Sequence, residues 1–269
     1  MASILDSEVA RRSAAAADAD FVSTLHRQLA RSPQGLVSAG AILGLWGLSL
    51  AALLPLDLQT IPPLAVAGFV AVRTFLHTGL FITAHDAMHG AVIPGNRPLN
   101  DRIGAVCTWL YCLLPYRTLL AKHGLHHRHP ATVFDPDFHG GPGGMLGWYA
   151  RFMASYLTDR TQALLLVFGM GALTALALGV LGLSPLNLLL FWIAPLVLSS
   201  VQLFFFGTYL PHREESGGWQ NRHRAKSLPL AHLWSFLACY HFGYHWEHHE
   251  YPQLPWFALP AAYDHSRRR

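Results

Sequence analysis

Residues 240–255 read YHFGYHWEHHEYPQLP and contain His245, His248 and His249 in the pattern H-x-x-H-H. Positions i, i+3 and i+4 of an α-helix lie on one face, so these three imidazoles are expected to aim at a single point. A neutral imidazole offers one lone pair, and three of them on one face can bind a metal ion. The stretch therefore predicts a metal-binding helix, which we expect to cover residues 230–250.

The histidine pattern occurs twice more upstream. His123, His126 and His127 repeat H-x-x-H-H, and His85 with His89 gives an i, i+4 version. Structural zinc sites favour thiolates and need only about four ligands, whereas eight or nine imidazoles are enough for two metals with open positions. Imidazole suits Zn, Cu, Fe and Ni alike, so these ligands by themselves do not name the metal.

Composition indicates a membrane protein. Of the 269 residues, 52% are hydrophobic and only 13% are charged, and the apolar residues come in long runs. The net charge of +4, without a basic helix stripe, gives no sign of a nucleic-acid partner. Cys107, Cys112 and Cys239 form no C-x-x-C pair and indicate neither a disulfide framework nor a zinc ribbon. The first apolar run starts too far in for a cleavable signal peptide.

Four apolar stretches reach the length of about 20 residues that a helix needs to cross a bilayer. They are residues 36–56, 64–84, 161–183 and 185–210. Residues 103–120 are also apolar, but Pro115 and Arg117 interrupt them, which favours a re-entrant or interfacial hairpin. We expect an all-α integral membrane protein with about four transmembrane helices, one such hairpin and a histidine-rich cap that holds a di-metal site.

Charge predicts how the chain is oriented in the membrane. Residues 1–33 are polar and form an expected cytoplasmic tail with a short surface helix over residues 20–30, and residues 34–269 form the membrane domain. The two turns between consecutive spans contain no Lys or Arg, and every basic residue except Arg73 falls on the other side. Basic residues accumulate on the cytoplasmic side. Both termini and all the histidine boxes are therefore expected to face the cytoplasm.

The second span carries two unusual polar side chains, Arg73 and His77. A charge within a span is costly and normally faces the protein interior or a polar cavity. We expect Arg73 to snorkel or to pair with a headgroup or a carboxylate, and His77 to make a structural hydrogen bond rather than to bind metal.

The ordered set of motifs resembles the membrane fatty-acid desaturase and hydroxylase superfamily, whose members hold two irons with histidines and activate O₂. Within that superfamily, four strings are similar to bacterial β-carotene ketolases: FITAHDAMHG (81–90), HHRHP followed by DPDFH (126–139), FGTYLPHRE (206–214) and YHFGYHWEHHEYPQLPW (240–256). The resemblance covers roughly residues 75–260. One H-x-x-H-H box would be a weak signal, but four strings in this order are specific.

The resemblance implies nine iron ligands: His85, His89, His123, His126, His127, His212, His245, His248 and His249. His212 is included in this set because members of the superfamily also take a ligand from the stretch before the third box. His241 is a tenth candidate, either as a ligand or as an outer hydrogen-bonding partner. Five nearby carboxylates could orient imidazole N–H groups or could equally serve as caps and solvated charges: Asp86, Asp135, Asp137, Glu247 and Glu250.

The implied activity is oxidation of the C4 methylene of a β-ionone ring to a ketone. Two hydroxylations at one carbon give a geminal diol, which loses water, so β-carotene would yield echinenone and then canthaxanthin, and zeaxanthin would yield astaxanthin. The implied cofactors are two iron ions, with O₂ as co-substrate and a lipid-soluble carotenoid as substrate. Because the chain has no dinucleotide fingerprint and no iron–sulfur cysteine set, electrons are expected from an external carrier such as ferredoxin.

Three alternative functions stay open at this point. A carotenoid hydroxylase would stop at the alcohol, and an acyl-lipid desaturase of the same superfamily would act on acyl chains. A membrane metal-binding or transport protein would need polar residues inside its spans to form a path. Here the spans are nearly bare of such residues, and the histidines gather at one face.

Overall fold

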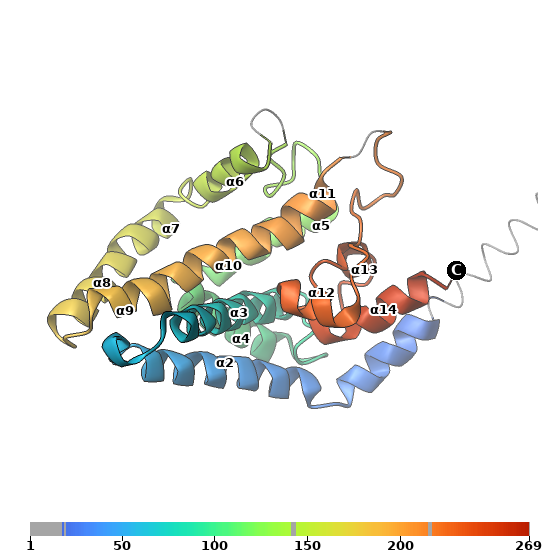
Figure 1. Ribbon diagram of the computed structural model, residues 1–269. Helices are drawn as coiled ribbons and strands as arrows, with labels where there is room; N and C mark the ends of the chain where they lie inside the picture. The colour runs from blue at the N-terminus through green and yellow to red at the C-terminus, as the bar shows by residue number, and fades with distance from the viewer. Residues whose placement is uncertain (1–17, 19, 141–143, 215–216, 269) are drawn as a thin grey trace, which may run out of the picture.

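The computed structural model describes residues 18, 20–140, 144–214 and 217–268, and every regular element in these ranges is helical (Figure 1). Four helices are long and apolar enough to cross a membrane: Gln34–Leu53, Pro63–Met88, Arg160–Gly179 and Pro185–His212. Each agrees with a predicted span to within a few residues. The expectation of an all-α protein with four spans is confirmed.

The first two spans, α2 (Gln34–Leu53) and α3 (Pro63–Met88), form a hairpin closed by a short turn that contains the 3₁₀-helix Leu58–Thr60. Pro63 occupies the first position of α3, where the missing N–H of proline costs nothing because it would have no intrahelical partner. α3 continues to Met88 and therefore carries the first histidine box on its last turn and its C-cap.

The last two spans are built from α-helical pieces joined by π-helical turns. The third span consists of α7 (Arg160–Leu164), a π-turn (Leu165–Gly169) and α8 (Met170–Gly179). The fourth consists of α9 (Pro185–Leu188), a π-turn (Leu189–Ile193), α10 (Ala194–Phe204), a π-turn (Phe205–Tyr209) and α11 (Leu210–His212). Such π-turns are frequent at functional sites, and the last of them stands directly before the turn that ends at His212.

Between the two span pairs, α4 (Arg97–Cys112) and α5 (Tyr116–Arg128) meet at an angle of 102°. The helix breaks at Leu113, whose φ of 52° is left-handed, and Pro115 cannot donate the hydrogen bond that a continuing helix would need. This bent pair has the geometry expected of the predicted re-entrant or interfacial hairpin. α6 (Gly144–Ser155) then leads from the second histidine box to the third span.

The third box lies on a cap made of α12 (His232–Cys239), α13 (His245–Glu250) and α14 (Leu259–Ser266). The prediction of one continuous helix over residues 230–250 is wrong. Tyr240 and His241 have φ values of 48° and 61°, which break the helix after Cys239. The N–H of Leu228 then donates to the carbonyl of Gly243 at 2.8 Å, so the next segment is held by the loop before α12. α13 consequently has an axis of its own.

The cap and the short turns lie at opposite ends of the bundle. Figure 1 shows the α2–α3 and α8–α9 connections at one end, with α11, α13 and α14 at the other. This is the separation on which the charge-based topology depends. The assignment of the cap to the cytoplasm stays a prediction.

The predicted N-terminal helix over residues 20–30 is present, and it packs onto the cap. Its apolar side chains, including Phe21 and Val22, contact a cluster formed with Tyr244 and Tyr263. Residues 1–17 and 19 of the predicted tail lie outside the described residues. The domain boundary at residue 33 stays a prediction.

Arg73 differs from expectation. Its side chain is fully buried, and it neither snorkels nor meets a carboxylate. Instead Nε donates to the carbonyl of Phe191 at 3.0 Å, and Nη1 donates to the carbonyl of Trp46 at 2.8 Å and to Ser49 Oγ at 3.0 Å. The guanidinium thereby joins α2, α3 and the fourth span from within the bundle.

His77 has the structural role that the sequence predicted. Trp46 Nε1 donates to its Nδ1 at 3.1 Å. The ring proton therefore sits on Nε2, which donates to the carbonyl of Tyr111 at 2.9 Å. With both nitrogens used in this way, the buried imidazole has no lone pair left for a metal.

Candidate metal centre

Nine histidines converge where α3, α5, α11 and α13 meet. They form two groups, and within each group the candidate ligand atoms all lie within 4.8 Å of one another. The five-histidine group contains His85, His89, His123, His127 and His248. The four-histidine group contains His126, His212, His245 and His249. These are the nine residues that the sequence proposed as ligands, and their folded positions bring all nine together.

In the five-histidine group the Nε2 atoms point inward. The Nε2 of His248 lies 3.1 Å from that of His85 and 2.9 Å from that of His127. The Nε2 atoms of His89 and His123 are 2.7 Å apart. Imidazole lone pairs that converge so closely need a shared cation or proton between them, so the donor set fits one metal ion.

The four-histidine group is a chain of ring nitrogens. Its Nε2 atoms follow one another from His126 to His249 at 3.1 Å, from His249 to His245 at 3.1 Å and from His245 to His212 at 3.0 Å. All four side chains are buried. Neutral nitrogen donors in this number suit iron, zinc or copper, and two neighbouring groups of them provide for two ions.

Each H-x-x-H-H box is divided between the two groups, and this corrects the expectation that a box aims at a single point. In the third box His245 and His249 join the four-histidine group, while His248 joins the five-histidine group. The second box divides in the same way, with His126 in the opposite group from its neighbours. The reason is helical geometry, because adjacent residues point about 100° apart around the axis.

Three ligand candidates have an outer partner that fixes the ring. Both carboxylate oxygens of Asp135 accept from His126 Nδ1 at 3.0 Å. The carbonyl of Arg224 accepts from His212 Nδ1 at 2.8 Å. Asp86 Oδ1 lies 3.5 Å from the Nδ1 atom of His85, a longer contact. When Nδ1 carries the proton, Nε2 presents its lone pair inward, which is how outer carboxylates and carbonyls orient metal-binding imidazoles.

Asp137 lies in one group with His126 and Asp135, within 4.8 Å, whereas the two glutamates bind elsewhere. Glu247 accepts from the hydroxyls of Ser227 and Ser266, so it anchors α13 to the rest of the cap. Glu250 accepts from Arg222 and His223 at the surface. For these two glutamates, the fold supports a structural or surface role and not the orientation of a ligand imidazole.

His241 lies apart from both groups. Its ring packs against Tyr244 and Trp256, with centroid distances of 5.7 Å and 6.1 Å. It is absent from the metal-capable groups of the described residues. The helix break at Tyr240 is the physical cause, because it removes the helical turn that would have aligned His241 with His245.

Burial favours the neutral form of the three imidazoles of the third box. Burial, followed by the neighbouring imidazoles, lowers the pKa of His245, His248 and His249 well below the usual value for histidine. These three imidazoles therefore present lone pairs at neutral pH. Burial alone would also lower the pKa of His126, but its hydrogen bond with Asp135 and the charge of that carboxylate raise it. Burial alone would raise the pKa of Asp135, but the hydrogen bond and charge of His126, together with the backbone N–H groups of Asp137 and Ala131, outweigh burial and lower that pKa.

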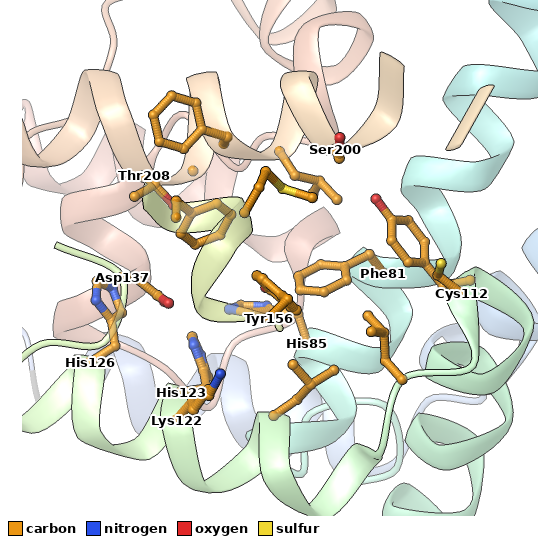
Figure 2. A pocket seen from close by; sticks show the side chains of 18 of the residues that line it. Phe81, His85, Cys112, Lys122, His123, His126, Asp137, Tyr156, Ser200 and Thr208 are labelled. Carbon is orange, nitrogen blue, oxygen red and sulfur yellow. The ribbon is translucent and has the colours of Figure 1, made fainter. Parts of the chain in front are cut away.

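A cavity of about 260 Å³ opens next to the histidines (Figure 2). Aromatic, aliphatic and sulfur-containing side chains from α3, α4, α6 and α10 line most of it. Its lining also includes His85, His123, His126 and His245. Figure 2 shows Lys122 and Asp137 in the same wall, close to His123 and His126. Burial raises the pKa of Asp137 to about 6. Such a cavity suits a rigid, apolar molecule with one end at the metal centre.

Comparison with known proteins agrees with this arrangement. The family model "Fatty acid desaturase" matches residues 60–166 and 143–269. The chain belongs to the fatty acid desaturase family. The matched residues include the second, third and fourth predicted spans and all nine clustered histidines.

Three relatives in this family carry functional names. The chain is 44% identical over 230 residues to the β-carotene ketolase of Paracoccus sp. (strain N81106 / MBIC 01143), covering 84% of this chain and 91% of the relative. It is 44% identical to the β-carotene ketolase of Haematococcus lacustris, covering 76% of this chain and 63% of that protein. It is 40% identical to the zeaxanthin 4-ketolase of Chlamydomonas reinhardtii, covering 82% of this chain and 49% of that protein. No solved structure matches the chain.

Arg224 is the feature of the site that sequence reasoning missed. Its carbonyl holds His212, and its guanidinium donates to the carbonyl of Ala131 at 3.0 Å. The N–H of Ala131 in turn donates to Asp135, the partner of His126. Arg224 lies 12 residues after His212. No motif or periodicity in the sequence connects these two positions, so sequence reasoning could not have identified the role of Arg224.

Proposed function

We infer that the protein is a carotenoid ketolase that oxidises the C4 methylene of a β-ionone ring to a ketone. The observation that carries this conclusion is the 44% identity to a bacterial β-carotene ketolase over nearly the whole length of both chains. The two histidine groups beside an apolar cavity support it. Substrates by this reasoning are β-carotene and its mono-ketone, with zeaxanthin as a further candidate.

We propose that the five-histidine and four-histidine groups each hold one iron ion. Bound iron would supply the binding and reduction of O₂. The chain would provide nine imidazoles, and His126, His212 and His85 would be kept in orientation by their Nδ1 partners. Burial of these rings excludes water and fixes the donors before the substrate arrives, so little reorganisation is needed during the reaction.

The cavity would orient the substrate by shape. Its apolar wall fits a polyene end ring, and the ring would lie against the end that His123 and His245 line. Each hydroxylation consumes one O₂, two electrons and two protons, and it yields one alcohol and one water. A second hydroxylation at the same carbon gives the geminal diol, which loses water to leave the ketone. Asp137 and Lys122 are the charged side chains at that end of the cavity.

We further propose insertion in the bacterial cytoplasmic membrane, with both termini and the metal centre on the cytoplasmic side. The distribution of basic residues supports this orientation. A ferredoxin-type protein would then supply electrons from the cytoplasm, because the chain has no nucleotide motif or iron–sulfur cysteine set of its own.

The test is expression in cells that make β-carotene, followed by mass spectrometry of the extracted pigments. A ketolase adds one oxygen and removes two hydrogens per modified ring. Addition of oxygen alone would indicate a hydroxylase, and a change confined to acyl chains would indicate a desaturase. The His248→Ala variant is the control, since it removes one candidate ligand; ketone formation by that variant would contradict the assignment of His248.

A further inference from the structure

A second hollow opens on the surface above the four-histidine group and has no lining residue in common with the cavity among the described residues. It is a groove of about 600 Å³ between the loop after α5 and the loop after α11. Its wall is formed by Ala131, Phe138, Glu214, Trp219, Asn221, Arg222 and Arg224. The groove is thus separate from the substrate cavity, although both approach the same metal centre.

The groove wall is hydrogen-bonded directly to the four-histidine group. Arg224 is exposed at the surface, yet its carbonyl accepts from His212 Nδ1 at 2.8 Å. On the opposite wall the N–H of Ala131 donates to Asp135 at 2.8 Å, and Asp135 holds His126 at 3.0 Å. Two ligand candidates are therefore one or two hydrogen bonds away from the surface.

Next to this wall, His223 lies with its ring centroid 5.8 Å from that of His249. The structure gives no equally short connection from this groove to the five-histidine group among the described residues. Electron transfer slows steeply with distance and is favoured by bonded and hydrogen-bonded routes. The groove is therefore a place from which an electron could reach the four-histidine metal first.

The backbone at Arg224 is held in an unfavourable conformation. Its φ of 42° is left-handed, a conformation that is unfavourable for a non-glycine residue. The carbonyl and the side chain of Arg224 are both engaged, one with His212 and the other with Ala131. These two contacts fix the distance between the groove wall and the metal ligands.

The charge of the groove indicates the kind of partner. Arg222 projects with 74% of its side chain exposed, and Arg224 is also exposed. Arg213, at the start of the same loop, is exposed too. Against these stand two carboxylates, Glu214 in the wall and Glu250, which pairs with Arg222 at 3.0 Å. Basic side chains around a shallow contact steer an acidic protein and orient it without tight binding, as in weak redox encounters.

From these observations we propose that the groove between Ala131 and Arg224 is the docking surface for an acidic one-electron carrier protein. Electrons pass from the docked carrier to the four-histidine metal through Arg224–His212 and the His223 edge. The proposal rests on the proposed function for its need of electrons, two for each O₂ reduced. It adds where they arrive and which of the two metals receives them first.

The experiment measures binding and turnover separately, on the full chain in neutral-lipid nanodiscs. The probe is a plant-type [2Fe–2S] ferredoxin, used in a redox-inert gallium-substituted form for binding. Arg222→Glu reverses the most exposed charge of the groove, and Arg31→Glu is the matched control because Arg31 is exposed beside the N-terminal helix. We expect the dissociation constant of ferredoxin to rise about tenfold in Arg222→Glu, with a weaker salt dependence, and to stay unchanged in Arg31→Glu.

Turnover then separates docking from folding. With native ferredoxin, the KM for ferredoxin should rise in Arg222→Glu while the maximal rate stays the same, and with dithionite as reductant the variant should equal the wild type. The proposal is overturned by absence of ferredoxin binding to the wild type, by equal effects of the two variants, or by loss of dithionite-driven activity in Arg222→Glu. It is also overturned if phosphatidylglycerol in the nanodisc blocks binding, which would make the groove a lipid site. Normal binding without ketone formation would instead contradict the proposed function.

Discussion

Replacing Asp135 by Asn should weaken one metal site and leave the other intact. Asp135 is 4% exposed and accepts from three donors: His126 Nδ1, the N–H of Ala131 and the N–H of Asp137. An asparagine of the same shape keeps one acceptor oxygen but turns the other into an NH₂ group. That NH₂ would face one of the backbone N–H donors.

The expected magnitude has two parts. A buried donor left without an acceptor costs about 1–3 kcal/mol of folding stability. Loss of an outer carboxylate costs about 10–100-fold in metal affinity, which corresponds to roughly 1.4–2.7 kcal/mol of binding free energy. Because His126 belongs to the four-histidine group alone, the loss should fall on one ion.

The assay is metal content per chain after dialysis against a graded series of chelator concentrations. The wild type should release its two ions in one range of chelator, whereas Asp135→Asn should release the first ion at about 10–100-fold lower concentration and the second as the wild type does. Asp86→Asn is the matched comparison, since its contact with His85 is longer, at 3.5 Å, and a smaller effect is expected. Unchanged retention of both ions by Asp135→Asn, in protein with a normal unfolding profile, would refute the role given to this carboxylate.

Three further outcomes follow from the structure. His248→Ala and His245→Ala should each abolish ketone formation and retain one metal per chain, as measured by metal analysis, because the two histidines serve different groups; a variant that keeps both ions would contradict the division. Gly207→Ala should lower the free energy of unfolding by about 1–3 kcal/mol, because its Cβ would lie 2.2 Å from the Phe242 ring. Gly171→Ala, with open space around it, should leave that free energy unchanged; thermal unfolding of both variants measures the difference. Burial and then the nearby His232 lower the pKa of His241 from 6.5 to about 4. Between those pH values the unfolded chain takes up a proton that the folded protein does not, so stability should fall as pH falls through this window, and the fall should be smaller in His241→Gln.

The sequence by itself determined the membrane class, the four spans and the identity of the clustered histidines. Hydropathy is a local property, so apolar runs of about 20 residues predict spans without knowledge of their neighbours. The histidine motifs are likewise local, and their resemblance to a known superfamily added His212, which no spacing connects to the third box. The structural role of His77 also followed from its place inside a span.

Tertiary structure decided how those histidines are shared. A box on a straight helix offers one face, but His245 and His248 belong to different histidine groups because other helices supply the remaining imidazoles of each group. The break at Tyr240 removed His241 from the site, and carbonyls of distant helices, rather than a carboxylate, accept from Nε and Nη1 of Arg73. These outcomes depend on contacts between segments far apart in the chain, such as the 118 residues between Arg73 and Phe191. Local periodicity contains no information about such pairings, because they form only when the helices pack.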